Sequence, residues 1–207
     1  MAGQINLSTE FGRRLRDLAA LPDLRVWVDV GTWSGQGSTL CIAEGMKSRK
    51  DLSGCAIISL EASKEWYAVA SDFWRKSPLV GAPLNLPVHI LHGRIAESMM
   101  TETEARQDPA FESIKDHFNL HYHNDWKDFH DAPLIKISAA DAVVLDGGEW
   151  AGYQDWLQIK PLRPKIVALD DIYTCKNLRV FQEMLMEGWR VTYICDDRNG
   201  SAILRAP

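Results

Sequence analysis

Short apolar runs recur along the chain, and stretches long enough for helices separate most of them. Five runs are rich in β-branched and aliphatic residues: 26–30 (VWVDV), 56–60 (AIISL), 88–91 (VHIL), 142–145 (AVVL) and 166–169 (IVAL). Near-continuous apolar runs of this length are typical of central parallel strands that are covered on both faces. The intervening residues 38–50 and 63–76 have the length and period of helices. This alternation predicts a Rossmann-like, doubly wound α/β sheet.

The C-terminal part of the chain has a different pattern. Residues 178–187 predict a helix that ends at Gly188, and the runs 189–195 and 201–204 predict two more strands. The dipeptide Asn-Gly at 199–200 lies between these runs and is a strong signal for a hairpin. We therefore expect a mostly parallel, seven-stranded sheet that ends in an antiparallel C-terminal hairpin.

Two segments lie outside the strand-helix repeat. Residues 8–21 predict an amphipathic N-terminal helix, and residues 97–140 form a long insertion between the third and fourth strands. The polar centre of the insertion, HYHNDWKDFHD (121–131), favours a helix followed by a loop over a site, because long loops in compact domains are usually functional or disordered. Asp125, Trp126 and Lys127 are the candidates for a lid that contacts the substrate.

Composition narrows the class of protein. The 207 residues, 46% hydrophobic and 25% charged, suit one globular domain over 1–207. The chain has 23 basic and 28 acidic residues and a net charge of −5 without a basic stripe, which disfavours a nucleic-acid partner. No run of about 18 apolar residues predicts a membrane span, and no apolar signal-peptide core is visible. The four widely spaced cysteines are expected to be buried thiols, which fits a cytoplasmic protein. The apolar face of the N-terminal helix could support a homodimer.

Candidate ligand-binding residues gather where the predicted strands end. In an open parallel α/β sheet, ligands bind beyond the carboxyl ends of the strands. The residues at these five ends are Asp29, Gly31, Thr32, Trp33, Gly35 and Ser38; Glu61 and Ala62; Gly93 and Arg94; Asp146 and Glu149; and Asp170 and Asp171. The first turn has the glycine spacing G-x-x-x-G-x-G, which lets a backbone pass close to a ligand but differs from the dinucleotide fingerprint G-x-G-x-x-G. Glu61 can accept hydrogen bonds from both hydroxyls of a ribose.

Four segments carry a resemblance to a known family: VDVGTWSGQGST (28–39), SLEAS (59–63), VVLDGGEW (143–150) and ALDDI (168–172). They resemble the motifs of class I S-adenosylmethionine-dependent methyltransferases. The chain looks most like small-molecule and sugar O-methyltransferases, in which the motif of the fourth strand reads DGGH or DGGE. The resemblance implies S-adenosyl-L-methionine as the cofactor and O-methylation of a small hydroxylated acceptor, such as a saccharide or a secondary metabolite.

The resemblance also implies roles for the residues of the cofactor site. Gly31 and Gly35 would cradle the methionine part, Ser38 would contact its carboxylate, Glu61 would hold the ribose, and the region of Arg94 would border the adenine. The remaining residues expected at the cofactor are Asp29, Thr32, Trp33, Ala62, Gly93 and Asp146.

Asp146, Asp170 and Asp171 suggest a metal site. The fourth and fifth strands lie side by side in this fold, so the three carboxylates would converge and repel one another without a counter-ion. Oxygen ligands suit Mg²⁺ or Ca²⁺, and the three positions match the metal ligands of catechol-type O-methyltransferases. The alternative is that these aspartates cap or orient turns.

Glu149 is the candidate for the catalytic base, with Asp146 beside it at the reacting centre. Related enzymes carry His or Lys at the position of Glu149. A carboxylate can serve there if burial raises its pKa, or if a metal has already acidified the acceptor hydroxyl.

Three alternatives remain open at this point. His117, His121 and His130 in the insertion could bind a transition metal such as zinc, although no cysteine or H-E-x-x-H pattern supports this. A second alternative is an NAD(P)-dependent oxidoreductase on a similar sheet. A third is a catalytically silent protein that keeps the fold and binds the cofactor.

Overall fold

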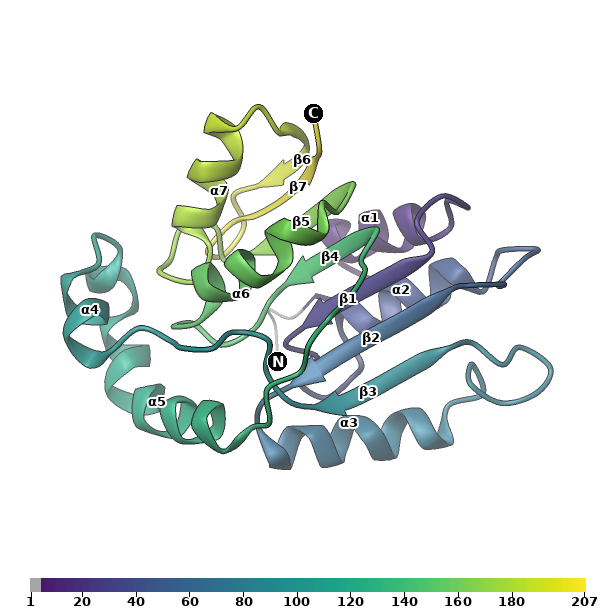
Figure 1. Ribbon diagram of the computed structural model, residues 1–207, viewed down its shortest axis with the longest axis horizontal. Coiled ribbons are helices and arrows are strands. Elements are labelled where there is room, and N and C mark those ends of the chain that lie inside the picture. Colours follow the sequence, from purple (N-terminus) through teal and green to yellow (C-terminus); the bar gives the residue numbers. More distant parts are fainter. Residues whose placement is uncertain (1–4) are drawn as a thin grey trace.

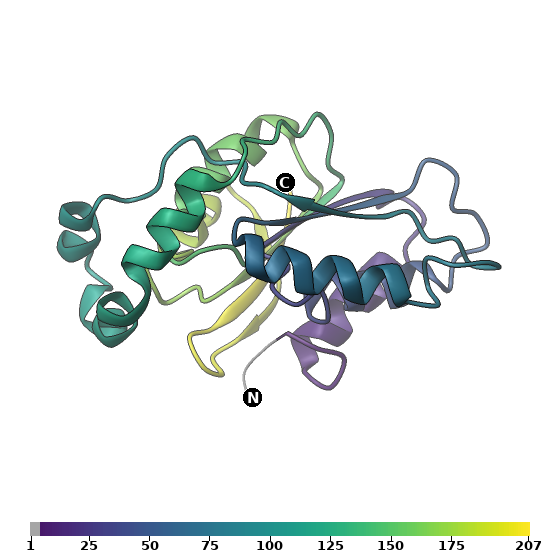
Figure 2. The same cartoon turned by 90° about the horizontal axis from the view of Figure 1, so that it is seen from below.

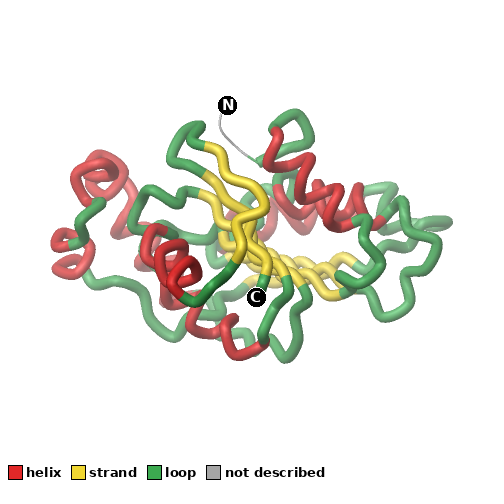
Figure 3. The backbone as a smooth tube through the Cα atoms, turned by 90° about the horizontal axis from the view of Figure 1, so that it is seen from above, coloured by secondary structure: helices red, strands yellow, loops and turns green. Residues whose placement is uncertain are grey.

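The protein has a seven-stranded mixed sheet between two layers of helices (Figures 1 and 3), as seen in a computed structural model that describes residues 5–207. The strands are β1 (Val26–Val30), β2 (Ala56–Glu61), β3 (Val88–His92), β4 (Ala142–Leu145), β5 (Ile166–Asp170), β6 (Arg190–Cys195) and β7 (Ser201–Arg205). Their order across the sheet is β3-β2-β1-β4-β5-β7-β6. Strands β1 to β5 are parallel, and β7 is antiparallel to both β5 and β6. The predicted fold class, including the C-terminal hairpin, is confirmed.

Helices cover both faces of the sheet. The helical segments are α1 (Glu10–Ala19), α2 (Ser38–Met46), α3 (Lys64–Lys76), α4 (Glu102–Gln107), α5 (Phe111–Asp131), α6 (Gly152–Ile159), the 3₁₀ turn η1 (Lys160–Leu162) and α7 (Leu178–Met186). Helices α1, α2 and α3 pack on one face, and α6 and α7 pack on the other. Along β4, Ala142 and Val144 face the first layer, whereas Val143 and Leu145 face the second. Burial on both faces explains why the central strands β1, β4 and β5 read as continuous apolar runs.

The apolar face of helix α1 packs into the core of the fold. Its apolar residues Phe11, Leu15 and Ala19 are buried in the core with α2. A Cβ on Gly45 of α2 would lie 2.1 Å from the carbonyl oxygen of Arg16, so glycine allows this close packing. The apolar face on which the predicted homodimer depended is thus used within the chain.

The insertion between β3 and β4 differs from the prediction. Residues 121–131, expected to contain a loop after a helix, form the second half of α5, so Asp125, Trp126 and Lys127 lie on a helix. The physical reason is an apolar stripe at helical spacing, whose buried members are Phe111, Ile114, Phe118, Tyr122 and Phe129. This stripe packs on Trp150, and α4 and α5 project beyond the carboxyl ends of the parallel strands (Figures 1 and 2).

Within residues 5–207, none of the helices is long and apolar enough to cross a membrane. The four cysteines are free; three are buried, and Cys195 is half-buried.

The strand ends are aligned and held by one side chain. Val30, Leu145 and Leu169 are register neighbours across β1, β4 and β5, so the residues that follow them emerge at the same level. The buried Asn177, directly before α7, donates from Nδ2 to the carbonyl oxygens of Leu145 (2.9 Å) and Asp170 (2.7 Å). The ends of β4 and β5 are therefore joined by a single amide.

This bridge predicts a large effect of Asn177→Ala on stability. The substitution leaves two buried carbonyl oxygens without their partner, and we expect the free energy of unfolding to fall by about 2–3 kcal/mol. Urea unfolding followed by tryptophan fluorescence measures it. The control Asn119→Ala changes an exposed residue of α5 and should cost less than about 0.5 kcal/mol. Equal costs for the two variants would contradict the bridging role.

Candidate functional site

A cavity of about 1000 Å³ lies at the carboxyl ends of the parallel strands and extends to α5. Ten predicted site residues line it: Gly31, Trp33, Glu61, Ala62, Gly93, Arg94, Asp146, Glu149, Asp170 and Asp171. Four predicted cofactor residues are not among the lining residues: Asp29, Thr32, Gly35 and Ser38. The cavity spans the boundary between β1 and β4, where the strand order reverses and ligands bind in such sheets.

Asp29 and Ser38 belong to a buried network beneath the cavity wall. The carboxylate of Asp29 accepts hydrogen bonds from the hydroxyls of Ser38 (2.8 and 2.9 Å), Thr39 and Ser59. Burial raises the pKa of Asp29 to about 6, although these hydrogen bonds oppose the shift. Ser38 donates its hydroxyl hydrogen to Asp29. It therefore does not offer this hydrogen to a ligand in the cavity, which is the role that the resemblance implied. The hydroxyl of Thr32 joins the same network through Thr39.

The two glycines of the first turn have separate structural roles. Gly31 has φ +91°, and a Cβ there would lie 2.2 Å from the carbonyl oxygen of Asp146. Only glycine therefore lets the β1 turn pass this close to the end of β4. Gly35 has φ +76°, and its carbonyl oxygen accepts a hydrogen bond from Nε1 of Trp74 in α3 (3.0 Å). Gly35 thus holds the turn against α3.

Glu61 stands at the end of β2 with its carboxylate held by backbone groups. Its Oε2 accepts from the amide of Trp33 (2.7 Å) and its Oε1 from the amide of Ser63 (3.0 Å). Burial raises the pKa of Glu61 to about 7 against the effect of these hydrogen bonds. Each carboxylate oxygen has a second lone pair for a ligand. The ring of Trp33 lies 4.8 Å from that of Trp66, so an aromatic wall adjoins the carboxylate.

The charge of Arg94 acts on an acid that the sequence analysis did not identify. The guanidinium of Arg94 lies 4.5 Å from the ring centroid of Phe129. It donates from Nη1 to the carbonyl oxygen of Ala96. Its buried Nε has no hydrogen-bond partner among residues 5–207. Asp155 of α6 also lines the cavity and is buried. Burial raises the pKa of Asp155 to about 7, opposed by the Ala96 amide and the charge of Arg94. The only signal for Asp155 was one acid in the helix GYQDWLQI.

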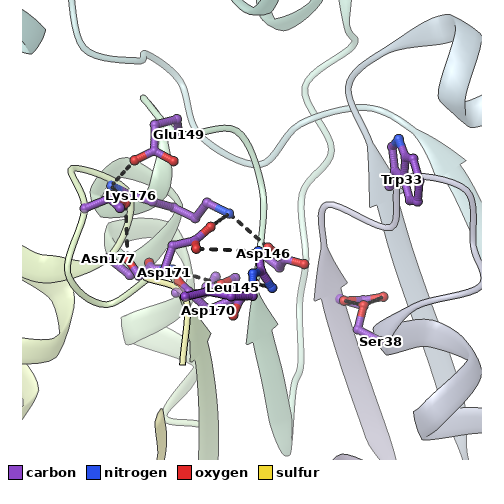
Figure 4. A network of polar contacts seen from close by, with 12 residues as sticks. Trp33, Ser38, Leu145, Asp146, Glu149, Asp170, Asp171, Lys176 and Asn177 are labelled. Carbon is purple, nitrogen blue, oxygen red and sulfur yellow. Dashed lines mark hydrogen bonds and ion pairs between the residues drawn. The ribbon is translucent and has the colours of Figure 1, made fainter. Parts of the chain in front are cut away.

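The predicted convergence of Asp146, Asp170 and Asp171 is confirmed. One carboxylate oxygen of each lies within 4.8 Å of the others. Figure 4 shows that a lysine enters this group: Nζ of Lys176 lies 2.9 Å from Oδ1 of Asp146 and 2.7 Å from Oδ2 of Asp171. The side chain of Lys176 is only 8% exposed. The more exposed Arg198 lies 3.7 Å from Asp170.

The charges of this cluster stabilise one another. Burial opposes the charge of Lys176, but the carboxylates of Asp146 and Asp171 outweigh it and raise the pKa of Lys176 well above its ordinary value. Burial would also raise the pKa of Asp171, yet the Lys176 ammonium holds it below its usual range. Asp170 has no such close partner, and burial together with the charge of Asp146 raises its pKa to about 7. Lys176 thus supplies the buried positive charge of the cluster, and the more exposed Arg198 lies farther away, 3.9 Å from Asp171.

The carboxylates of this cluster are the group at which the sequence suggests a divalent cation. Mg²⁺ and Ca²⁺ need several carboxylate oxygens directed at one point. In this structure Lys176 takes an oxygen of Asp146 and an oxygen of Asp171 at hydrogen-bond distance. As arranged, these side chains fit an ammonium and do not fit a hard divalent ion. Lys176 was not identified from the sequence because it comes six residues after the end of β5.

Glu149 lies above the same lysine. Its Oε1 accepts from the backbone amide of Lys176 at 3.3 Å, and Figure 4 shows its carboxylate over that residue. Burial raises the pKa of Glu149, although the charge of Lys176 opposes the shift. A buried carboxylate at the cavity wall with a raised pKa has the properties of a proton acceptor.

Helix α5 supplies polar groups to the opposite wall. His117, His121 and Asp125 line the cavity, and the two imidazole rings are 4.6 Å apart. Asp125 accepts from Nε1 of the buried Trp150 (3.2 Å), and burial raises its pKa. Trp126 is 46% exposed and is not among the lining residues.

The zinc alternative receives no support. The ring of His130 stacks on Trp126 at 3.9 Å, and neither residue lines the cavity. Within residues 5–207, the only group of three or more metal-ligand side chains is Asp146, Asp170 and Asp171. The histidines of α5 therefore do not assemble a zinc site.

Comparisons with known proteins identify solved structures with this fold. No family model and no curated protein sequence matches the chain. An O-methyltransferase from Bacillus cereus in complex with SAH (S-adenosylhomocysteine) has a TM-score of 0.58 over 100% of this chain and 84% of that one, at 18% identity. The SAH-bound methyltransferase PaMTH1 of Podospora anserina has a TM-score of 0.55 (95% and 77% covered, 15% identity).

A third structure is TomG of Streptomyces achromogenes, an O-methyltransferase of tomaymycin synthesis solved with SAM. Its TM-score is 0.53, with 94% and 78% of the two chains covered at 16% identity. At such low identity the likeness shows a shared fold: the seven-stranded Rossmann-like sheet of these methyltransferases.

The buried acid of α6 predicts a specific pH dependence of stability. Because the pKa of Asp155 is raised on folding, the native state binds more protons than the unfolded state between about pH 4 and pH 7, and stability falls as pH rises through this window. Asp155→Asn removes this effect. We expect wild type to lose at least about 1 kcal/mol relative to the variant across the window, as measured by urea unfolding at each pH.

A matched control for this experiment is Asp116→Asn, which changes an exposed residue of α5. Its stability should follow that of the wild type at each pH. A constant difference between wild type and Asp155→Asn would contradict the assignment.

Proposed function

We propose that the protein is a methyltransferase that uses S-adenosyl-L-methionine (SAM) and methylates an oxygen of a small hydroxylated acceptor. The observation that carries the proposal is the position of Glu61. A half-buried carboxylate with free lone pairs stands at the tip of β2, beside the glycine turn and two tryptophan rings, in a cavity at the strand-order reversal. This is where an adenosine-bearing ligand binds in such sheets.

The residues of this wall fit SAM. Glu61 would accept from the ribose hydroxyls, the rings of Trp33 and Trp66 offer a flat apolar surface, and the β1 turn at Gly31 lies open to the methionine part. When bound, SAM supplies a methyl group whose bond to the sulfonium breaks, with the electron pair going to sulfur, as a lone pair of the acceptor oxygen forms the new C–O bond. The same residues lack the G-x-G-x-x-G turn of an NAD(P)-dependent oxidoreductase.

The other half of the cavity supports a polar acceptor. Its lining includes His117, His121, Asp125, Glu149 and Lys176, which between them offer donors and acceptors for several hydroxyl groups. A saccharide or a hydroxylated secondary metabolite has this chemistry. We propose no nucleic-acid or membrane partner.

Glu149 is the proposed catalytic base. Burial raises the pKa of its carboxyl, so it can take the proton that leaves the acceptor hydroxyl. Asp146, beside it at the end of β4, would orient the acceptor or the methyl donor. The proposed reaction contains no step through Mg²⁺ or Ca²⁺, because Lys176 is hydrogen-bonded to Asp146 and Asp171.

Binding of the cofactor product is the first test. Isothermal titration should show SAH binding to the wild type, and Glu61→Gln should weaken it at least about tenfold, because a charged acceptor for two hydroxyls is lost. The control Glu112→Gln changes an exposed residue of α5 and should bind SAH like the wild type. Tight binding of NAD without binding of SAH would refute the proposal.

Turnover is the second test. With radiolabelled SAM and a panel of saccharides and phenolic metabolites, an acceptor should be methylated. On this acceptor Glu149→Gln should lower kcat about 100-fold while SAH affinity stays within twofold, because only the proton transfer is removed. Asp146→Asn should also lower turnover. Full turnover in both variants would disprove the mechanism, and SAH binding without turnover of any acceptor would favour the silent, cofactor-binding alternative.

A further inference from the structure

Lys176 is built into the carboxylate cluster and is not a surface side chain that folds back. Its backbone amide donates to Oε1 of Glu149 (3.3 Å) and to Oγ1 of Thr174 (3.2 Å). The next residue, Asn177, is bound to the ends of β4 and β5. A Cβ on Gly152 would lie 2.0 Å from the carbonyl oxygen of Lys176, so the start of α6 packs directly against this backbone. The backbone from which the Lys176 side chain extends is therefore held in place by its neighbours.

The ammonium of Lys176 is shared by two carboxylates. Nζ of Lys176 lies within 3 Å of oxygens from two different strand ends, those of Asp146 after β4 and Asp171 after β5. Asp170 and Glu149 add two more carboxyl groups around it. A divalent ion at this point would have to displace the ammonium or accept a like charge beside it, and both are unfavourable in a buried site.

We propose that Lys176 takes the place of a divalent cation in this site and that the protein acts without a metal ion. The ammonium fixes the geometry of Asp146 and Asp171 and faces the cavity, where it can stabilise negative charge on the acceptor oxygen. The last step rests on the proposed methyltransferase function. The exclusion of the metal rests on the cluster alone and can be tested separately.

Metal binding is measured with Mn²⁺, whose free and bound forms electron paramagnetic resonance distinguishes. Wild type, freed of metal by EDTA, should bind no stoichiometric Mn²⁺ at millimolar concentration. Lys176→Ala removes the ammonium and leaves three converging carboxylates, so it should bind one Mn²⁺ at least about tenfold more tightly than wild type. The added substitution Asp171→Asn should abolish the acquired site. A merely structural role of Lys176 would not create a metal site.

Three controls keep this result interpretable. Lys176→Arg retains the positive charge and should bind no more Mn²⁺ than wild type. Lys160→Ala changes a lysine that pairs with Glu183 and Glu187 away from the cavity, and it should also match wild type. Circular dichroism shows whether each variant folds, and Lys176→Gln, which keeps much of the side-chain length, is the second variant if Lys176→Ala does not fold.

Two results of the metal-binding measurements would overturn the proposal. One is a stoichiometric Mn²⁺ or Mg²⁺ site in the wild type at micromolar affinity that Asp171→Asn abolishes. The other is a folded Lys176→Ala or Lys176→Gln protein that binds no more Mn²⁺ than wild type. EDTA should leave wild-type turnover unchanged, and loss of turnover that Mg²⁺ restores would equally overturn it. SAH titration of the same samples tests the cofactor site, so failure of the methyltransferase proposal is recognised separately.

Discussion

A buried positive charge makes the acidic end of the sheet possible. Asp146, Asp170, Asp171 and Glu149 all line one cavity, and carboxylates this close cannot all ionise without compensation. Lys176 provides the compensation from within the chain, with ion pairs to Asp146 and Asp171. Removing one partner of such a group leaves an unpaired buried charge, which is costly. The loop after β5, the end of β4 and the start of α7 are therefore constrained together.

The backbone geometry that brings these groups together follows from the parallel sheet. Register neighbours in parallel strands end at one edge, so Asp146 and Asp170 emerge side by side. The chain adds two local devices to this general rule. Gly31 allows the β1 turn to pass within contact of Asp146, and the amide of Asn177 joins the last carbonyl groups of β4 and β5. The strand ends and their turns thus form one side of the cavity. Helix α5, which belongs to the long connection between β3 and β4, covers the other side.

The parts of the fold that were predictable are those with strong local patterns. The apolar runs identified the five parallel strands most clearly in β1, β4 and β5, where both faces are buried, and Asn-Gly identified the hairpin. Helix α5 was only partly identified because His, Asn and Asp between its apolar residues obscure a stripe that is buried on one side only. The stripe from Phe118 through Tyr122 to Phe129 becomes clear once Trp150 is known to pack against it.

The site was predictable to the extent that position along a strand determines position in space. Ten candidates line the cavity for that reason. Ser38 does not, because a buried aspartate competes for its hydroxyl, and no pattern in the chain reveals that competition. Lys176 lies on a loop, and its side chain reaches back across the strand ends to Asp146, thirty residues earlier in the sequence. Three aligned aspartates alone suggest a metal, whereas in the fold a buried lysine already supplies a positive charge to two of them. Charge balance at a site is therefore a property of the fold, and ligand type alone does not determine which cation completes it.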